Sequence, residues 1–128
     1  MILIVGGAFQ GKKKYAMQTL GLSEEDFTDG STCKPEEIFA AKAVSHFQEY
    51  IRRCMQQGQE VSSLAEELGK LNPDAVILAN EMGSGVVPAD AFDRAYREAV
   101  GRTCCELAKQ AKEVHRVICG IGMVIRHG

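Results

Sequence analysis

Three residues near the start of the chain have the types and spacing of a phosphate-binding loop. Gly6, Gly11 and Lys12 follow the pattern G-x-x-x-x-G-K-[ST], in which backbone N–H groups surround phosphates and the lysine reaches the β and γ oxygens. The residues predicted to bind nucleotide are Gly6, Gly7, Ala8, Phe9, Gln10, Gly11, Lys12 and Lys13. The alternative is a glycine turn that only joins a strand to a helix.

The last position of this pattern departs from it. Lys13 stands where a Ser or Thr hydroxyl would coordinate Mg²⁺, and an ammonium group can attract phosphate but cannot bind a metal ion. If Lys13 removes one ligand, Asp29 and Glu81 would have to hold the ion between them. We therefore predict Lys12, Asp29 and Glu81 as catalytic residues and Asp29 and Glu81 as metal ligands. The alternatives are a turn aspartate and a carboxylate that only structures a glycine-rich turn.

The apolar pattern predicts strands alternating with helices. Strands are expected at 1–5, 27–30, 75–79 and 114–119, and helices at 12–20, 35–54, 61–71 and from Asp90 to about 112. The stripe of Ile38, Ala41, Val44, Phe47, Ile51 and Cys54 predicts the second helix, which Gly58 ends and which contains His46. This alternation favours an α/β fold, P-loop NTPase-like (RecA-like), with a mostly parallel sheet and helices on both faces.

Length and composition predict one domain over residues 1–128. A net charge of −2 indicates neither a nucleic-acid surface nor a polybasic membrane patch. The apolar runs are too short to span a membrane, and the N-terminal run lacks the basic region of a signal peptide. The five cysteines have no C-x-x-C spacing and are interpreted as free thiols. We expect a cytoplasmic protein.

A second motif follows the strand expected at 75–79. The sequence Asn80-Glu81-Met82-Gly83-Ser84-Gly85-Val86-Val87-Pro88 resembles the N-E-V-G-x-G-I-V-P motif of the adenosylcobinamide kinase / adenosylcobinamide-phosphate guanylyltransferase family. The similarity continues through Arg94, Arg97, Gly101-Arg102 and Leu107-Ala108 to Cys119-Gly120-Ile121-Gly122, like the family's S-G-I-G. The loop at 6–12 resembles the family's G-G-A-R-S-G-K-S. The chain is identified as a short and divergent member of this family.

The resemblance implies a role in cobalamin biosynthesis or corrinoid salvage. Family members use ATP or GTP with Mg²⁺ to phosphorylate adenosylcobinamide, then transfer GMP from GTP onto that phosphate through a guanylylated histidine. They assemble as trimers, so a homo-oligomer is expected, with a nucleoside triphosphate and a corrinoid as binding partners. Gly83, Gly85, Arg97 and Arg102 are the residues expected to bind substrate. The alternative for the arginines is a solvated or interface surface of the helix.

The sequence departs from the family in four places. Lys13 replaces the loop serine, the segment before Asn80 is much shorter, and Thr103-Cys104-Cys105 stands where the family has Asn-Gln after its Gly-Arg. The stretch H-x-x-x-R-P, which carries the family's guanylylated histidine, is absent. The sequence therefore favours the kinase step over guanylyl transfer. The alternative functions are a catalytically degenerate relative that binds nucleotide or corrinoid, and a purely structural subunit.

Overall fold

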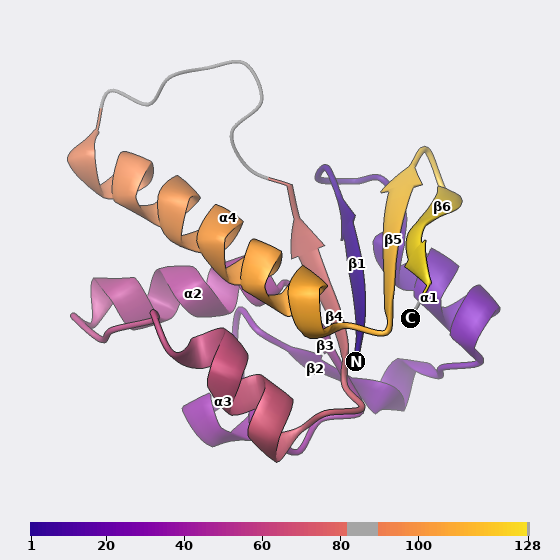
Figure 1. Cartoon of the computed structure of the whole chain (residues 1–128), viewed down its shortest axis with the longest axis horizontal. Coiled ribbons are helices and arrows are strands. Elements are labelled where there is room, and N and C mark those ends of the chain that lie inside the picture. Colours follow the sequence, from indigo (N-terminus) through magenta and orange to yellow (C-terminus); the bar gives the residue numbers. More distant parts are fainter. Residues whose placement is uncertain (82–89, 128) are drawn as a thin grey trace.

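The computed structural model describes residues 1–81 and 90–127, and within them six strands form one sheet (Figure 1). The strand order is β2-β3-β4-β1-β5-β6, and neighbouring strands are parallel except for the antiparallel pair β5–β6. The strands are β1 Ile2–Gly6, β2 Phe27–Asp29, β3 Ala43–Ser45, β4 Val76–Asn80, β5 Glu113–Ile118 and β6 Ile121–His127. The predicted P-loop NTPase-like α/β fold with a mostly parallel sheet is confirmed.

Helices cover both faces of the sheet (Figure 1). The helices are α1 Lys12–Leu20, α2 Phe47–Gln56, α3 Leu64–Leu71 and α4 Ala91–Gln110, with short 3₁₀ helices at Glu24–Asp26 and Pro35–Phe39. Successive residues of a strand point to opposite faces. Leu3 of β1 accordingly packs with α2, α3 and α4, while Ile4 packs with Ala16 of α1. Two apolar cores result, one on each side of the sheet.

Strand β1 lies at the centre of this arrangement. It pairs in parallel with β4 on one side and with β5 on the other. A strand buried on both faces requires a continuous apolar run, and the sequence Ile-Leu-Ile-Val supplies it. The register aligns Gly6 with Asn80, so the segments that follow β1 and β4 leave the sheet side by side. In parallel α/β sheets this edge is where ligands bind.

The single helix predicted over 35–54 is wrong. The chain instead forms the 3₁₀ helix Pro35–Phe39, strand β3 and then helix α2. The three residues of β3 are all buried, and one of them, Val44, falls between Ala41 and Phe47 in the apolar spacing of three that imitates a helix. The connection between the 3₁₀ helix and β3 is held by Asn72, whose Nδ2 donates to the carbonyl oxygens of Ile38 and Ala41 at 2.9 and 2.8 Å.

This correction moves His46 out of a helix. His46 lies between β3 and α2 with a φ of 52°, in the left-handed region that few residues other than glycine adopt. Gly58 has a φ of 74° directly after α2, as expected for a glycine that ends a helix. Asp90 caps α4 as predicted, its Oδ1 accepting a hydrogen bond from the Phe92 N–H at 2.7 Å.

The end of the chain also differs from the expectation. Residues 121–127, where no strand was expected, form β6, which runs antiparallel to β5. Cys119 and Gly120, between the two strands, both have positive φ values, 51° and 76°. Two successive positive φ values are typical of the tight turns that join antiparallel strands. The chain therefore closes the sheet with a hairpin at one edge.

Within the described residues, no helix is long and apolar enough to cross a membrane.

The close contact between β1 and β5 gives a stability prediction. A Cβ atom added at Gly6 would lie 2.5 Å from the backbone oxygen of Val117, which cannot move without disturbing the sheet. We expect Gly6→Ala to lower the free energy of unfolding by about 2 kcal/mol or more. Denaturant titration measures this change.

Gly101 provides a matched control for this substitution. It lies inside α4, and a Cβ atom there meets no described atom within 4 Å. Gly101→Ala should therefore raise the free energy of unfolding by about 0.5–1 kcal/mol, because alanine favours a helix over glycine. Equal effects of the two substitutions would show that the contact with Val117 does not constrain the strand.

Candidate functional site

The glycine-rich loop between β1 and α1 is shaped by its backbone and by a distant hairpin. Phe9 is fully exposed and has a φ of 61°, and Gly11 has a φ of 82° where α1 begins. The backbone oxygen of Gln10 accepts a hydrogen bond from the Gly120 N–H at 2.8 Å. Its side-chain Oε1 accepts another from the Cys119 N–H at 2.6 Å. The turn between β5 and β6 thus supports the loop.

Lys12 directs its ammonium group back into this loop. Its Nζ donates to the backbone oxygen of Gly7 at 2.9 Å, to that of Gly6 at 3.3 Å and to Oδ1 of Asn80 at 2.7 Å. Partial burial lowers the pKa of Lys12, and the negative charge of Glu81 opposes this shift. All three acceptors are neutral oxygens, so they leave the positive charge available to an anion.

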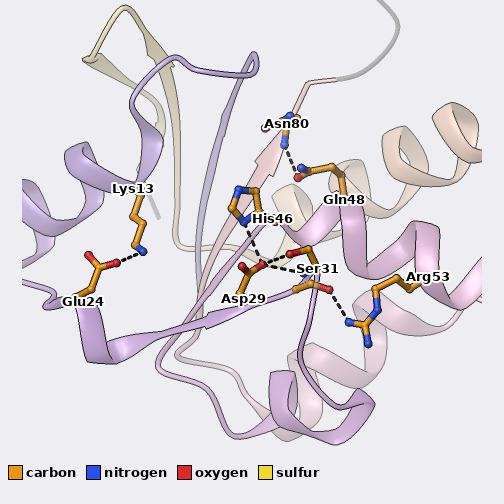
Figure 2. A network of polar contacts seen from close by, with 9 residues as sticks. Lys13, Glu24, Asp29, Ser31, His46, Gln48, Arg53 and Asn80 are labelled. Atoms are coloured by element: carbon orange, nitrogen blue, oxygen red, sulfur yellow. Dashed lines mark hydrogen bonds and ion pairs between the residues drawn. The ribbon is translucent and has the colours of Figure 1, made fainter.

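Lys13 points elsewhere. Its Nζ forms an ion pair with Glu24 (Figure 2). The same Nζ lies 5.1 Å from the centroid of the Phe27 ring. The position where the motif would have a metal-binding hydroxyl therefore carries an ammonium group that is paired with a carboxylate. The loop does not fit a Mg²⁺ ion at this position, because an ammonium offers no lone pair to a metal.

Asp29 and His46 form a second polar group next to the loop. Oδ1 of Asp29 lies 3.1 Å from Nδ1 of His46 and accepts hydrogen bonds from the backbone N–H and the hydroxyl of Ser31 at 2.9 and 2.6 Å (Figure 2). Partial burial by itself would raise the pKa of Asp29, but the hydrogen bonds from Ser31 and the contact with His46 outweigh it and lower that pKa. The carboxylate is held in its charged form.

Tight backbone packing holds the ends of β2 and β3 together at this point. The Gly30 N–H donates to the Ser45 oxygen at 2.7 Å, and a Cβ at Gly30 would lie 2.6 Å from the His46 oxygen. The guanidinium of Arg53 donates to the carbonyl oxygens of Gly30 and Cys33 at 2.8 and 2.6 Å. Asp29 and His46 are therefore positioned by the sheet and α2 and not by a free loop.

Glu81 follows Asn80 in the chain, and its contacts are with β5 and β1. Its carboxylate pairs with Arg116 of β5 at 2.8 and 3.1 Å, and its N–H donates to the Gly6 oxygen at 2.9 Å. Glu81 and Asp29 thus have different side-chain partners. Among residues 1–81 and 90–127, no group of three or more His, Cys, Asp or Glu side chains has the arrangement of a metal site. The metal-binding role of the two carboxylates stays a prediction.

A cavity of about 360 Å³ brings part of the predicted site together. It is lined by residues 8–14 of the loop and α1, by Ser45, His46 and Leu78, and by Asn80. A second cavity of about 260 Å³ shares Asn80 and is lined by Glu81 and by Val5, Val100, Gly101 and Cys104. Asn80 separates the two, and its N–H donates to Oε1 of the buried Gln48 at 3.0 Å (Figure 2).

Those residues predicted to bind substrate that the structure describes are not found in the lining of these two cavities. Gly83 and Gly85 lie outside the described residues. Arg97 and Arg102 are on α4, and Arg102 pairs with Glu98 beside a separate cavity of about 370 Å³. His46 was not predicted as a site residue, because the helical pattern of the sequence concealed β3. The signal that could have identified it is the polar pair Ser45-His46, which follows the buried residues Ala43 and Val44 where a strand ends.

Comparisons with known proteins place the chain among relatives. The model of the cobinamide kinase / cobinamide phosphate guanyltransferase family matches residues 37–125. The bifunctional adenosylcobalamin biosynthesis protein CobU of Escherichia coli is 36% identical over 67 residues, which cover 52% of this chain and 37% of that protein. The protein of the same name from Salmonella typhimurium is 34% identical over 67 residues, with the same coverage.

These matches cover only part of each relative. The chain spans little more than a third of the length of the curated relatives that it matches. The residues that match the family model begin after the glycine-rich loop, so the geometry around Lys12 is separate evidence.

The lowered pKa of Asp29 gives a prediction for acid stability. A carboxylate whose pKa is lower in the folded state stabilises the fold above its unfolded pKa, and this contribution disappears as pH falls through the folded value. Asp29→Asn keeps an acceptor oxygen for Ser31 but does not titrate. We expect the variant to lose less stability than the wild type below about pH 4, the ordinary range of Asp.

Denaturant titrations between pH 5 and the acid limit of folding, values chosen around the ordinary Asp pKa of about 3.9, measure this difference. Asp74→Asn, at an exposed position, is the control for the change in net charge. Parallel pH profiles for Asp29→Asn and the wild type would contradict the prediction.

Proposed function

The chain belongs to the cobinamide kinase / cobinamide phosphate guanyltransferase family, and we propose that it phosphorylates adenosylcobinamide with a nucleoside triphosphate bound at loop residues 6–13. The observation that carries this proposal is the ammonium of Lys12, held by three neutral oxygens at the wall of the cavity formed by the loop. Phosphoryl transfer depends on positioning and on stabilising charge, and such a lysine supplies both to the β and γ phosphates.

The kinase step is favoured over guanylyl transfer. Guanylyl transfer in this family proceeds through a covalent histidine, and the stretch H-x-x-x-R-P that carries it is absent from the sequence. Either ATP or GTP serves as phosphoryl donor in the proposal. The reaction belongs to cobalamin biosynthesis or corrinoid salvage, in a cytoplasmic homo-oligomer, by family resemblance a trimer of single-domain chains.

The metal requirement follows from the loop chemistry. Lys13, paired with Glu24, occupies the position of the usual hydroxyl ligand, so the residues present do not fit Mg²⁺ there. Asp29 and Glu81 remain the proposed metal ligands. The carboxylate of Asp29 contacts His46, and that of Glu81 pairs with Arg116. If these carboxylates held Mg²⁺, the ion would supply positive charge that neutralises the phosphates of the nucleotide.

A second candidate function is a binding protein without turnover. The ion pair between Lys13 and Glu24 supports it, because the chain lacks the loop hydroxyl on which metal-dependent chemistry usually depends. Such a relative would bind nucleotide or corrinoid at the same cavity. Thermal stabilisation by nucleotide that persists in a metal chelator, without product, would favour this candidate.

The direct test is incubation of the protein with adenosylcobinamide and ATP or GTP. We expect phosphorylated corrinoid, detected by chromatography and mass spectrometry. Lys12→Met should lower kcat/KM by at least about 100-fold, because the charge at the transferring phosphoryl group is lost. Lys70→Met, which removes an exposed lysine paired with Glu66, is the control for charge. The proposal fails if the wild type forms no phosphorylated corrinoid with either nucleotide.

Lys13 gives a second prediction. Lys13→Thr restores the hydroxyl of the loop motif and frees Glu24 from its ion pair. We expect the variant to show about tenfold or greater stimulation by Mg²⁺ relative to the wild type, since a loop hydroxyl is a metal ligand in such sites. The measurement is the initial rate against Mg²⁺ concentration. Loss of nucleotide binding in Lys13→Thr would instead identify Lys13 as a phosphate ligand.

A further inference from the structure

His46 lies at the carboxyl end of β3 and lines the same cavity as the glycine-rich loop. Its left-handed backbone, with a φ of 52°, directs the side chain to this edge of the sheet instead of along α2. Left-handed conformations in residues other than glycine cost free energy and gather at functional sites. The side chain is 56% exposed, so a ligand in the cavity has access to it.

Asp29 determines which nitrogen of His46 faces the cavity. The charged carboxylate can only accept hydrogen bonds, so Nδ1, at 3.1 Å from Oδ1, carries the hydrogen of the neutral ring. Nε2 then has a free lone pair. Figure 2 shows the second ring nitrogen on the side of the ring away from Asp29. The ring thus presents a hydrogen-bond acceptor to the cavity.

A lone pair at this position selects a ligand group that donates a hydrogen bond. Phosphate oxygens are acceptors, and their place is with the ammonium of Lys12 and the backbone N–H groups of the loop. The other charged side chains that line the cavity are those of Lys13 and Lys14, which donate only. An alcohol hydroxyl is therefore the partner that matches Nε2.

We propose that Nε2 of His46 accepts a hydrogen bond from the alcohol hydroxyl that receives the phosphoryl group, and so positions the acceptor oxygen. This inference rests on the kinase activity proposed above and names the residue that aligns the second substrate. Asp29, through Nδ1, is a positioning residue for the ring.

The transfer itself is a balanced displacement. The acceptor oxygen forms a bond to the γ phosphorus, and the bond from that phosphorus to its bridging oxygen breaks. The nucleoside diphosphate leaves with the electron pair, and the hydroxyl proton passes along its hydrogen bond to Nε2 of His46 and from there to water. Because the transition state is loose, with little bond formation, alignment of the acceptor oxygen is the main contribution that a neutral side chain can make.

Two substitutions at one position separate alignment from folding. His46→Asn keeps a donor for Asp29 and tolerates a positive φ, but its amide ends short of the Nε2 position. His46→Gln places an amide oxygen near the Nε2 position. The readout is the ratio of phosphorylated corrinoid to free inorganic phosphate, with nucleotide labelled at the γ phosphate and adenosylcobinamide as acceptor.

We expect the ratio to fall about 10- to 100-fold in His46→Asn and to recover largely in His46→Gln, since small misplacements of a reacting group have effects of this size. The dissociation constant for nucleotide, measured without corrinoid, should change less than about twofold, a margin far below the tenfold step that 1.4 kcal/mol represents. The melting temperature of His46→Asn should match that of the wild type.

Each other outcome overturns the inference in a distinguishable way. An unchanged ratio in His46→Asn, with normal turnover, rejects the role of His46 and leaves the kinase proposal intact. Weaker binding of GTP but not of 2′,3′-dideoxy-GTP in His46→Asn would show that Nε2 contacts the ribose hydroxyls instead. A guanylylated His46, found by mass spectrometry, would make Nε2 a nucleophile. A wild type that forms no phosphorylated corrinoid rejects both proposals.

Discussion

The parallel pairing of β1 with β4 and β5 is the constraint on which the rest of the structure depends. Pairing on both sides places β1 in the middle of the sheet with Leu3 and Ile4 buried on opposite faces, so apolar helices are needed on both faces of the sheet. It also places Gly6 against the Val117 backbone and in register with Asn80. Lys12 can then reach the loop oxygens and Asn80 at once. The polar site is a consequence of how the central strand is packed.

Three charged side chains of the site, Lys13, Glu81 and Asp29, have charged or polar partners that compensate them, whereas Lys12 has no charged partner in direct contact among the described residues. Lys13 and Glu81 each have a charged partner, Glu24 or Arg116, and Asp29 has hydrogen bonds from Ser31 and His46. The ammonium of Lys12 instead donates to three neutral oxygens, those of Gly6, Gly7 and Asn80. An anion that enters the cavity therefore meets the ammonium of Lys12, which is not balanced by a charged partner in direct contact within the described part of the chain, together with the exposed ammonium of Lys14.

The sequence allowed the fold to be predicted where local signals and packing agree. The loop spacing, the bounds of α1 and the cap at Asp90 each depend on neighbouring residues, and all were found in the structure. The segment at 35–54 could not be predicted this way, because Val44 of the buried strand β3 falls in phase with a helical stripe. Its strand character comes from pairing with β2 and β4, which are distant in sequence. His46 was misplaced for the same reason. The roles of Asp29 and Glu81 stay open to experiment.

The support that Gln10 receives from the turn at Cys119 and Gly120 means that the loop is not a self-contained module. Its shape is encoded by two segments more than 100 residues apart in the chain. During synthesis the first ten residues leave the ribosome long before the hairpin that fixes their conformation. This conformation of the loop would then be among the last features of the protein to mature, and a loop grafted onto another scaffold would need its own replacement for that turn.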